Sequence, residues 1–334
     1  MKKLRAGIIG LGVGEKHIAG YQSHPDCEVT ALCDFSEEKL ALAGKKYAGV
    51  KLYSHAEELL QSPEIDMVSI ASYDNYHYQQ IVQAIENNKH IFVEKPLCLY
   101  EYEATHIRQL LQQKPSIKMS SNLILRLSPR FIQLKHMIEE GALGQLFYVE
   151  GDYNYGRLQK ITEGWRGKID YYSIVYGGGV HIVDLLLWLT GDRVTEVAAY
   201  GNNIASRGTD FRYNDMAVSI LKFESGLTGK VAVNFGCVSP HFHVLNVYGT
   251  RATFVNGLEH ATFYESREPA QKARKITTPY PGVEKGELIH SFVESILGRS
   301  AAGVTEEDIF KAMSVCFAIE KATHQPGAVK VKYI

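Results

Sequence analysis

The stretch Ala6-Gly7-Ile8-Ile9-Gly10-Leu11-Gly12-Val13-Gly14-Glu15 decides the fold of this chain. An apolar run over residues 5–10 ends in closely spaced glycines, which predicts a buried strand that turns directly into a helix. Glycines in such a turn let the backbone approach a pyrophosphate, and the helix N-terminus presents N–H groups to that anion. The first candidate residues of a nucleotide site are therefore Gly10, Gly12, Val13 and Gly14.

The glycine pattern departs from G-x-G-x-x-G, because the third glycine position is Glu15 and Gly14 comes one residue early. Asp34 supports the nucleotide site, since it ends the next predicted strand and lies 22 residues beyond Gly12. A carboxylate there accepts hydrogen bonds from ribose hydroxyls and repels a 2'-phosphate, so we expect NAD rather than NADP. The alternative is an aspartate that caps a turn at the strand end.

Short apolar runs alternate with helical patterns over the first third of the chain, which predicts a parallel sheet covered by helices. The expected strands are 5–10, 28–34, 66–72 and 90–94, and the expected helices cover 17–23, 36–47 and 76–87. Ser36 is the expected N-cap of the second of these helices. This first domain, a Rossmann-type sheet, is expected to span residues 1–122.

After residue 122 the predicted strands become longer and alternate, at 145–153, 217–223, 229–234 and 243–248. The turn Glu224-Ser225-Gly226 between two of them predicts antiparallel hairpins. Residues 267–285, with three prolines and several charges, are expected to form a long surface loop. A second domain is expected to span residues 123–334.

Composition excludes several classes of protein. The length of 334 residues corresponds to about two ordinary domains. With 36 Lys+Arg against 37 Asp+Glu the net charge is -1, so no basic field attracts nucleic acid. The five cysteines are scattered without a C-x-x-C pair, which argues against a disulfide framework and a structural zinc site. The apolar run at residues 6–11 is too short for a signal or a membrane span, so we expect a cytoplasmic protein.

The segment Val93-Glu94-Lys95-Pro96, which ends a predicted strand, resembles the hallmark of the Gfo/Idh/MocA family of sugar and cyclitol oxidoreductases. Ser69-Ile70-Ala71-Ser72, followed by Asp74 and His77, matches a family segment that usually reads Pro-Asn-x-x-His, but Tyr73 and Asp74 replace its Pro and Asn. The resemblance continues through residues 122–126, Trp165-Arg166, Gly177-Gly178-Gly179-Val180-His181-Ile182-Val183-Asp184 and Leu189-Thr190-Gly191.

The resemblance implies a Rossmann domain followed by an α/β domain built on an open, mostly antiparallel sheet. It also implies a nicotinamide cofactor, carbohydrate-like substrates, and a homodimer or homotetramer formed through the exposed face of the second sheet. Further cofactor-binding residues expected on this basis are Ser72, His77, Glu94, Lys95 and Arg126.

Oxidation of a secondary alcohol removes a hydride from carbon and a proton from oxygen, so the site needs a base and a cation that stabilises the developing alkoxide. Lys95 suits the cation role at the crevice outside the strand ends; the alternative is an exposed lysine in a turn. His181 suits the acid/base role, because its ordinary pKa is near neutral; the alternative is a core histidine on an apolar helix. Asp184, one helical turn on, is expected to orient His181, bind substrate or serve the structure.

One departure bears on the substrate. The family's common pattern is Asp-x-Gly-x-His, and the position of its aspartate is Gly177 here. A missing carboxylate removes one ligand for a substrate hydroxyl, which argues against a simple inositol or glucose dehydrogenase. Family branches that act on nucleotide-linked sugars vary this position, so a nucleotide sugar or a sugar acid becomes the expected substrate.

Aromatic and arginine side chains cluster in the second domain. Aromatic faces stack on sugar rings, and an arginine fork pairs with carboxylate or phosphate oxygens. The expected substrate contacts are Tyr153, Trp165 and Arg166, with Tyr155 and Arg157 beside them. The alternative places these tyrosines at a dimer interface, and Tyr171, Tyr172 and Tyr176 share that ambiguity. His241 and His243 alternate onto one strand face without a third ligand, so no metal is predicted.

These residues, together with what the family resemblance implies, leave three functions open. The first is an NAD-dependent oxidoreductase that transfers a hydride to or from a secondary alcohol of a sugar, sugar acid or nucleotide sugar. The second is a glycosidase of the same family that uses a tightly held NAD transiently. The third is a non-enzymatic NAD-binding regulator; the retention of Lys95 and His181 argues against it, whereas Gly177 keeps it open.

Overall fold

The computed structural model describes residues 3–284 and 286–334, and it divides into two compact units. Unit 1 contains the chain up to Ile124, the described part of Glu284–Phe310, and Ile334. Unit 2 contains Leu125–Val283 and Lys311–Tyr333. The first crossing falls two residues after the expected boundary at residue 122. The expected second domain, 123–334, differs from unit 2 because residues 284–310 group with unit 1.

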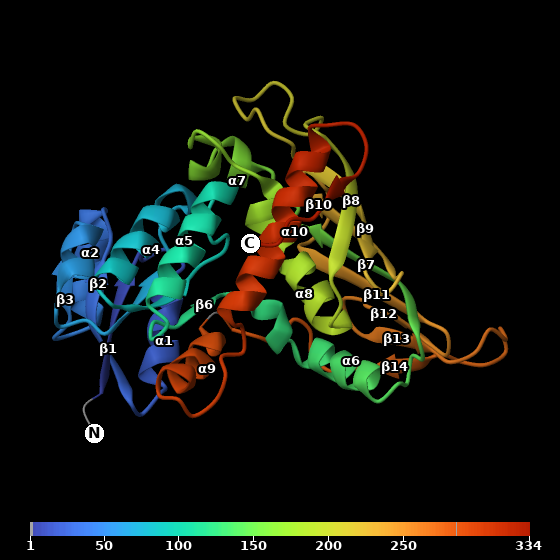
Figure 1. Ribbon diagram of the computed structural model, residues 1–334, viewed down its shortest axis with the longest axis horizontal. Helices are drawn as coiled ribbons and strands as arrows, with labels where there is room; N and C mark the ends of the chain where they lie inside the picture. Colours follow the sequence, from blue (N-terminus) through green and yellow to red (C-terminus); the bar gives the residue numbers. More distant parts are fainter. Residues whose placement is uncertain (1–2, 285) are drawn as a thin grey trace. The chain divides into compact units, whose positions relative to one another are not determined.

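Unit 1 is built on a six-stranded sheet in the order β3-β2-β1-β4-β5-β6, and every pair is parallel. The order reverses between β1 and β4, which places a topological switch point beside β1. Figure 1 shows this sheet in blue and teal. The strands are β1 (Leu4–Ile9), β2 (Cys27–Cys33), β3 (Lys51–Tyr53), β4 (Met67–Ile70), β5 (His90–Val93) and β6 (Met119–Ser121).

The helices of unit 1 cover this sheet. They are α1 (Glu15–Gln22), α2 (Glu37–Lys46), α3 (Ala56–Gln61), η1 (Asp74–Tyr76), α4 (His77–Glu86), α5 (Glu101–Gln113) and α9 (Glu287–Ile296). The predicted N-cap of α2 is confirmed, because the Ser36 side chain accepts a hydrogen bond from Lys39 N–H (3.4 Å). Glu37 and Glu38 in its first turn, with Lys45 and Lys46 in its last, complement the helix dipole.

A polar network attaches the α9 region to the connection between α1 and β2. The Nδ1 atom of His24 accepts a hydrogen bond from the backbone N–H of Asp26 (3.2 Å), so its Nε2 atom carries the proton and donates to Glu294 (2.8 Å). Arg299 bridges Asp26 (2.7 Å) and Glu294 (3.1 Å). This network, together with the packing of α9 on α1, β5 and β6, explains why a late segment belongs to unit 1.

Unit 2 contains a nine-stranded sheet in the order β14-β13-β12-β11-β7-β10-β9-β8-β15. The expected mostly antiparallel sheet is confirmed; the parallel pair is β7 with β10. The strands are β7 (Leu146–Asn154), β8 (Val194–Asn202), β9 (Met216–Phe223), β10 (Thr228–Asn234), β11 (Phe242–Gly249), β12 (Thr253–Val255), β13 (Ala261–Tyr264), β14 (Arg274–Ile276) and β15 (Val329–Lys330). The predicted hairpin across Glu224-Ser225-Gly226 joins β9 to β10.

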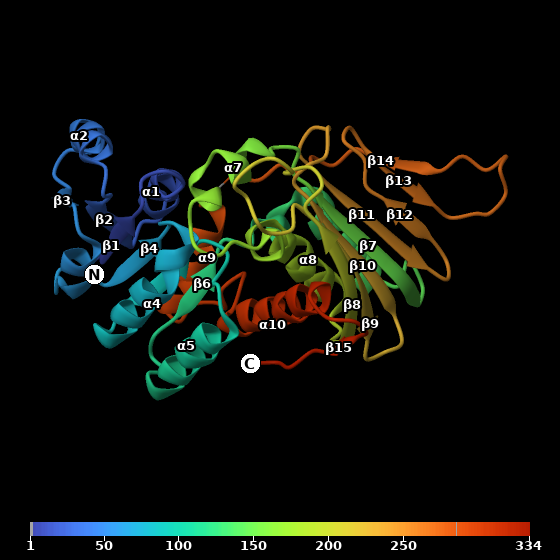
Figure 2. The ribbon, with the colours of Figure 1, turned by 90° about the horizontal axis from the view of Figure 1, so that it is seen from above.

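The helical segments of unit 2 are η2 (Ile124–Leu127), α6 (Pro129–Glu139), α7 (Gln159–Thr162), η3 (Trp165–Gly167), the π-helical turn η4 (Val175–Gly179), α8 (Val180–Thr190) and α10 (Glu306–Thr323). Of these, η4 packs on β7 and β10, and α8, which Figure 2 shows beside the sheet, packs on β7. The first residue of η2 and the first five of α10 belong to unit 1. Burial alternates along β7, β9 and β11, so the sheet has an inner face against these helices and an opposite, more exposed face.

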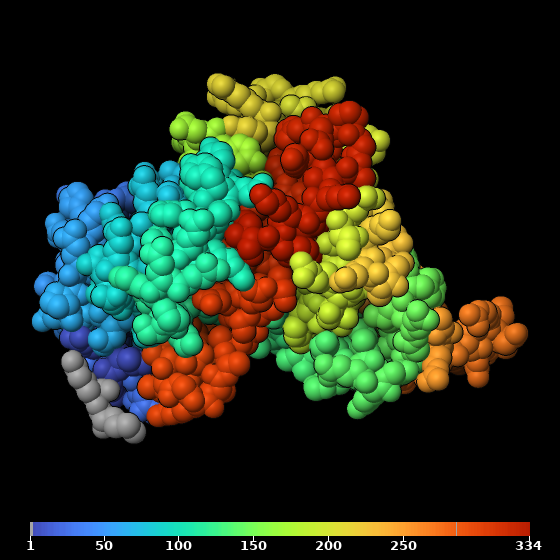
Figure 3. Space-filling model, viewed as in Figure 1, coloured from blue at the N-terminus to red at the C-terminus, as the bar shows by residue number. Residues whose placement is uncertain are grey.

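The expected long loop over 267–285 is interrupted by a strand. Residues 274–276 form β14, which pairs with β13, and the connection between these strands projects from unit 2 as the orange lobe in Figure 3. Two of the expectations above touch residues outside the described chain: the start of the chain at Met1 and Lys2, and the end of this loop at Lys285.

Candidate active site

The glycine turn joins β1 to α1 within unit 1. Gly10 has φ +88°, a left-handed conformation that glycine adopts without steric cost, and a side chain there would overlap the backbone of Ala71. Gly12 is exposed, and a Cβ atom placed on it would meet nothing within 4 Å. The turn is thus closed toward the protein and has open space beside the N-terminal end of α1.

Gly14 takes the packing role that the third glycine has in such turns. A Cβ atom on Gly14 would overlap the carbonyl oxygen of Gly10 and lie 3.0 Å from Ile8 Cγ2 and 3.1 Å from Ala71 Cβ. Helix α1 approaches β1 closely because this position has no side chain. Glu15, at the usual glycine position, instead pairs with Lys46 (2.7 Å), and this hydrogen bond lowers the pKa of the Glu15 carboxyl.

The carboxylate of Asp34 connects the end of β2 to the glycine turn. Its Oδ2 atom accepts the backbone N–H of Leu11 (2.7 Å), and its Oδ1 atom accepts that of Ser36 (2.9 Å). Lys39 Nζ lies 3.6 Å from Oδ2. A carboxylate has about four acceptor positions, so capacity remains for a ribose hydroxyl. Asp34 therefore orders the turn and is also suited to the expected ribose contact.

An aromatic pair stands at the carboxyl ends of β2 and β4. Phe35 is 67% exposed, and its ring centroid lies 5.6 Å from that of Tyr73. The sequence analysis did not include Phe35 among the candidate residues. The sequence feature that could have indicated it is a large apolar residue directly after Asp34. Exposed rings can stack on a base. The glycine turn, Asp34 and this pair together fit a bound dinucleotide.

His77 and Ser72 shape the neighbouring strand end. The imidazole of His77 is fully buried, with Nδ1 2.7 Å from the carbonyl oxygen of Pro96 and Nε2 3.2 Å from that of Ser72. It links the segment after β4 to the turn that follows Lys95. The Ser72 hydroxyl donates to Gln80 Oε1 (2.7 Å). These bonds favour a positioning role for His77 beside the expected cofactor contact.

Glu94 anchors the end of β5 in a buried polar network. Its Oε1 atom accepts the amide of Asn122 (2.7 Å) and lies 3.3 Å from His17 Nε2. His17 Nδ1 and the Tyr21 hydroxyl both contact Ser69 Oγ, at 3.1 and 3.0 Å. Sequence reasoning placed His17 on a helix but gave it no role. Its position on the helix after the glycine turn is a weak signal without the fold.

Lys95 directly follows Glu94 and is half-buried. The carboxyl ends of β1, β2 and β5 share one edge of the parallel sheet. The glycine turn follows β1, Asp34 follows β2, and Lys95 lies just after β5. Unit 1 therefore gathers most of the predicted cofactor residues at the edge where such sheets bind ligands. Arg126, also expected at the cofactor, belongs to unit 2.

Within unit 2, His181 lies in the first turn of α8, and its ring stacks on that of Tyr153 in β7 (centroids 6.0 Å, interplanar angle 16°). Tyr153 is 6% exposed on the inner face of the sheet, which does not match the interface alternative for this residue. His241 and His243 lie 5.1 and 5.3 Å from the Tyr153 ring. The inner face thus carries an imidazole and phenol cluster around Tyr153.

His243 belongs to the packed part of that cluster. The Tyr280 hydroxyl accepts the backbone N–H of His243 (3.0 Å) and donates to its Nδ1 atom (2.6 Å). Burial, with a smaller contribution from His241, lowers the pKa of His243 to about 3. His243 is consequently a neutral structural histidine.

Asp184 forms an ion pair with Arg126. Two hydrogen bonds join them, Nε to Oδ2 (2.9 Å) and Nη2 to Oδ1 (2.6 Å). Their side chains are 1% and 8% exposed, respectively. A bidentate pair this buried has a clear structural role.

Trp165 and Arg166 belong to η3 and lie near Tyr172 in unit 2. The Arg166 guanidinium lies 4.5 Å from the Trp165 ring centroid and 5.9 Å from that of Tyr172. Arg157 stacks similarly on Tyr155 (5.2 Å). The expected aromatic and arginine cluster is therefore present within this unit.

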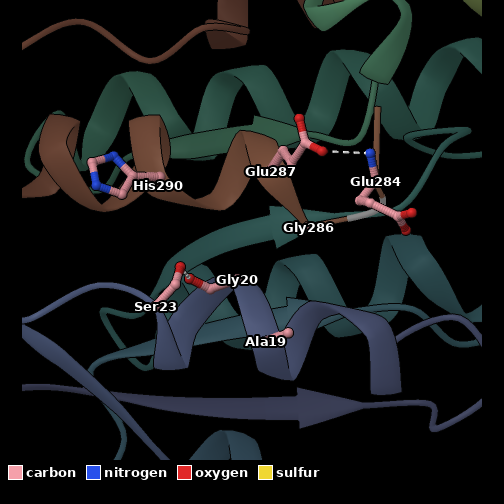
Figure 4. A pocket seen from close by; sticks show the side chains of 7 residues that line it. All are labelled: Ala19, Gly20, Ser23, Glu284, Gly286, Glu287 and His290. Atoms are coloured by element: carbon pink, nitrogen blue, oxygen red, sulfur yellow. Dashed lines mark hydrogen bonds between the residues drawn. The ribbon is translucent and has the colours of Figure 1, made fainter. Parts of the chain in front are cut away.

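One cavity of about 300 Å³ lies elsewhere in unit 1. Figure 4 shows residues of α1 on one side and residues at the start of α9 on the other. Its lining is Ala19, Gly20, Ser23, Glu284, Gly286, Glu287 and His290, and none of these is a predicted site residue. Among the described residues no three His, Cys, Asp or Glu side chains are grouped to hold a metal ion. Likewise, no helix of the described chain has the length and apolarity needed to cross a bilayer.

The fold and these residues define a two-domain dinucleotide-binding α/β protein. Residues 4–121 match the family described as "Oxidoreductase family, NAD-binding Rossmann fold", and residues 131–255 match the GFO/IDH/MocA C-terminal domain. The chain belongs to the Gfo/Idh/MocA oxidoreductase family.

Three known relatives match over nearly their full length. Myo-inositol 2-dehydrogenase of Thermotoga maritima is 23% identical, with 99% of both chains covered. A levoglucosan dehydrogenase in complex with NADH and L-sorbose superimposes with a TM-score of 0.87 at 20% identity, with 99% of each chain covered. A scyllo-inositol dehydrogenase from Lactobacillus casei with bound NAD(H) and scyllo-inositol gives 0.81 at 20% identity, with 99% of each chain covered. These structural matches concern the fold.

Proposed function

We propose that this protein is an NAD-dependent dehydrogenase that acts on a secondary alcohol of a sugar, sugar acid or nucleotide sugar. The observation that carries the proposal is the common sheet edge of the glycine turn, Asp34 and the Glu94-Lys95 segment. The first two suit a dinucleotide. The third adds the half-buried residue Lys95 just after β5, next to Glu94, which His17 and Asn122 hold in place. The names of the relatives support a polyol or sugar as substrate.

The cofactor would be held by the glycine turn at its diphosphate and by Asp34 at its ribose. The nicotinamide supplies hydride acceptance in one direction and hydride donation in the other. Asp34 favours NAD over NADP, because its carboxylate repels a 2'-phosphate. Lys39, 3.6 Å away, offsets part of that charge but remains 45% exposed to solvent, where charge interactions are screened.

Lys95 and His181 divide the remaining chemistry between them. The ammonium of Lys95 stabilises negative charge on the substrate oxygen as its proton leaves, and a fixed cation at that atom lowers the barrier. His181 accepts this proton at an imidazole nitrogen and returns it in the reverse direction. Tyr153, stacked on His181, restricts the orientation of the imidazole.

The test is a substrate panel of free polyols, sugar acids and nucleotide sugars with NAD, followed by NADH absorbance. Stoichiometric NADH formation supports the dehydrogenase. Cleavage of a glycoside without net NADH would indicate the NAD-dependent glycosidase instead. Binding of NAD without turnover of any of these substrate classes would indicate the non-enzymatic NAD-binding regulator.

We further propose that the protein is a cytoplasmic homodimer or homotetramer formed through the exposed face of the nine-stranded sheet. Large apolar side chains on this face include Ile220, 49% exposed, and Tyr200, 81% exposed. None of the five cysteines forms a disulfide, which suits a reducing compartment. Analytical sedimentation of the wild type and of Ile220→Arg tests this assembly, and the substitution is expected to weaken it. A wild type that sediments as a monomer would contradict the proposed oligomer.

A further inference from the structure

The segment Glu94-Lys95-Pro96, which follows β5, is held by a buried imidazole on each side of Lys95. The side chain of Glu94 lies 3.3 Å from Nε2 of His17, and the carbonyl oxygen of Pro96 lies 2.7 Å from Nδ1 of His77. Both histidines are 0% exposed. The residue that is proposed to stabilise the alkoxide therefore lies between two anchored neighbours.

His17 connects Glu94 to the helix that follows the glycine turn. An ionised carboxylate only accepts hydrogen bonds, so the proton of His17 is at Nε2, and Nδ1 accepts from the Ser69 hydroxyl, 3.1 Å away. Ser69 in turn accepts from the Tyr21 hydroxyl (3.0 Å). The backbone N–H of His17 donates to the carbonyl oxygen of Gly14 (2.9 Å). A neutral imidazole thus satisfies both of its side-chain partners and links Glu94 to the glycine turn.

His77 connects Pro96 to the end of β4. Both of its ring nitrogens face carbonyl oxygens, which only accept hydrogen bonds: that of Pro96 at 2.7 Å and that of Ser72 at 3.2 Å. A neutral imidazole has one N–H group, and the shorter distance indicates that it donates from Nδ1 to Pro96. The hydrogen bond to Pro96 is therefore the one by which His77 holds the segment.

The two imidazoles reach the segment from opposite faces of the six-stranded sheet. Helix α1 connects β1 to β2, whereas α4 connects β4 to β5 in the opposite direction across the sheet. Right-handed crossovers in opposite directions place their helices on opposite faces. Figure 2 shows α1 and α4 on either side of this sheet. A shift of the segment toward one helix is consequently resisted by the hydrogen bond from the other.

We propose that His17 and His77 are positioning residues that fix the backbone of Lys95, and through it the place of its side chain, for hydride transfer. This proposal rests on the proposed role of Lys95 and adds two residues that act through its neighbours. A displacement of about 1 Å at a reacting centre reduces a rate by about 10²-fold. The two histidines therefore affect the rate of the chemical step more than the binding of NAD.

Asparagine and glutamine distinguish the two nitrogens of each imidazole. Both amides supply N–H donors, and glutamine is one bond longer, so asparagine replaces Nδ1 and glutamine replaces Nε2. His17 binds Glu94 through Nε2, so His17→Gln should retain this bond and His17→Asn should lose it. His77 binds Pro96 through Nδ1, so the order is reversed: His77→Asn should retain the bond and His77→Gln should lose it. The exposed His55 of the same unit provides the control pair, His55→Asn and His55→Gln.

Hydrogen exchange followed by mass spectrometry measures the anchoring of the segment on the NAD-loaded full chain, without a substrate. Peptides that cover residues 94–98 should exchange about fivefold faster in His17→Asn and His77→Gln than in the wild type, which is the size expected for one lost hydrogen bond. The same peptides should exchange close to the wild-type rate in His17→Gln, His77→Asn and the His55 controls. Thermal unfolding of each variant verifies that it folds.

The rate of a single turnover is measured with NAD and each of myo-inositol, D-gluconate and UDP-glucose. We expect His17→Asn and His77→Gln to lower this rate by about 10–10²-fold, with a dissociation constant for NAD close to that of the wild type. A merely structural role would lower the rate in step with stability. It would not reverse the order of asparagine and glutamine between the two positions.

The same order of asparagine and glutamine at both positions, or equal exchange in all four variants, would overturn the proposal. The reversed order in exchange without NADH formation from any probe would support the anchoring and contradict the dehydrogenase function. NADH formation by the wild type, together with equal rates in all four variants, would support the dehydrogenase and refute the positioning roles.

Discussion

The guanidinium of Arg126 and the carboxylate of Asp184 form a bidentate ion pair inside unit 2, with Nη2–Oδ1 at 2.6 Å and Nε–Oδ2 at 2.9 Å. Asp184 lies one turn after His181 on α8, and Arg126 comes from the η2 segment. The pair therefore fixes the helix that carries the candidate base. It also indicates a structural role for two residues expected at the cofactor and the substrate.

Removal of one partner should be more damaging than removal of both. Arg126→Met leaves the Asp184 carboxylate buried without its cation, and we expect it to lower the free energy of unfolding by about 3–5 kcal/mol. The double variant Arg126→Met with Asp184→Leu should recover most of that loss, because it leaves no uncompensated charge. Urea denaturation of the three proteins measures both effects. If the double variant keeps its stability but loses affinity for NAD, Arg126 contacts the cofactor as well.

Replacement of Asp34 tests how the ribose is recognised. Asp34→Ala removes the charge expected to repel a 2'-phosphate, so the ratio of kcat/KM for NAD over NADP should fall. It also removes the acceptor of the Leu11 and Ser36 N–H groups, so the affinity for NAD should fall too. Asp34→Asn keeps an acceptor oxygen and separates the two effects. An unchanged cofactor ratio in both variants would mean that the ribose is recognised elsewhere.

His243 should make the protein sensitive to acid. Its pKa is about 3 in the folded protein, because the imidazole is buried, against an ordinary value near 6.5 in the unfolded chain. Below pH 6.5 the unfolded state takes up a proton that the folded state does not, so stability present above pH 6.5 declines toward pH 3. His243→Asn should weaken this decline, by on the order of a few kcal/mol. Thermal unfolding of the wild type and of His243→Asn at pH values from 6.5 down to 3 measures this loss of stability.

The matched control is His136→Asn, because the side chain of His136 is 67% exposed. This variant should unfold with the same pH dependence as the wild type. If His243→Asn also follows the wild type, the imidazole of His243 is protonated in the folded protein and the assignment of a neutral structural histidine is incorrect.

His181 should control the pH dependence of catalysis. We expect His181→Asn to lower kcat by about 10²–10⁴-fold, the usual contribution of a general base. The acidic limb of the kcat/KM profile, which reports the essential base, should disappear from the variant. The comparison is His324→Asn, whose side chain is 62% exposed. If His181→Asn keeps the acidic limb of the kcat/KM profile, the essential base is another residue.

Local patterns predicted much of the fold. The glycine turn, the apolar strands and the Ser36 cap depend on neighbouring residues, so they could be predicted from the sequence alone. The short strand β3 and helix α3 were missed because few apolar residues mark them. The assignment of residues 284–310 to unit 1 depends on contacts such as His24 with Glu294, which are 270 positions apart. No local pattern carries that information.

The candidate site was predicted less completely for the same reason. Lys95, Asp34 and the glycines belong to strand ends, whose order along the chain predicts a common sheet edge. The His17 contact with Glu94 depends on which helix face meets the sheet. The glycine motif departs from its usual form at Glu15, and Gly14, the preceding residue, takes over the packing role of the missing glycine. The sequence alone did not show that this departure is compensated.

The assignment of Lys95 is tested most directly by the rate of a single turnover. The enzyme is saturated with NAD, mixed with its substrate, and followed by NADH absorbance, with Lys95→Met compared with Lys118→Met, an exposed lysine of the same unit. Because Lys95 stabilises charge that develops only during reaction, the rate should fall by about 10²–10³-fold while the affinity for NAD stays near that of the wild type. A rate for Lys95→Met close to that of the Lys118 control would contradict the account.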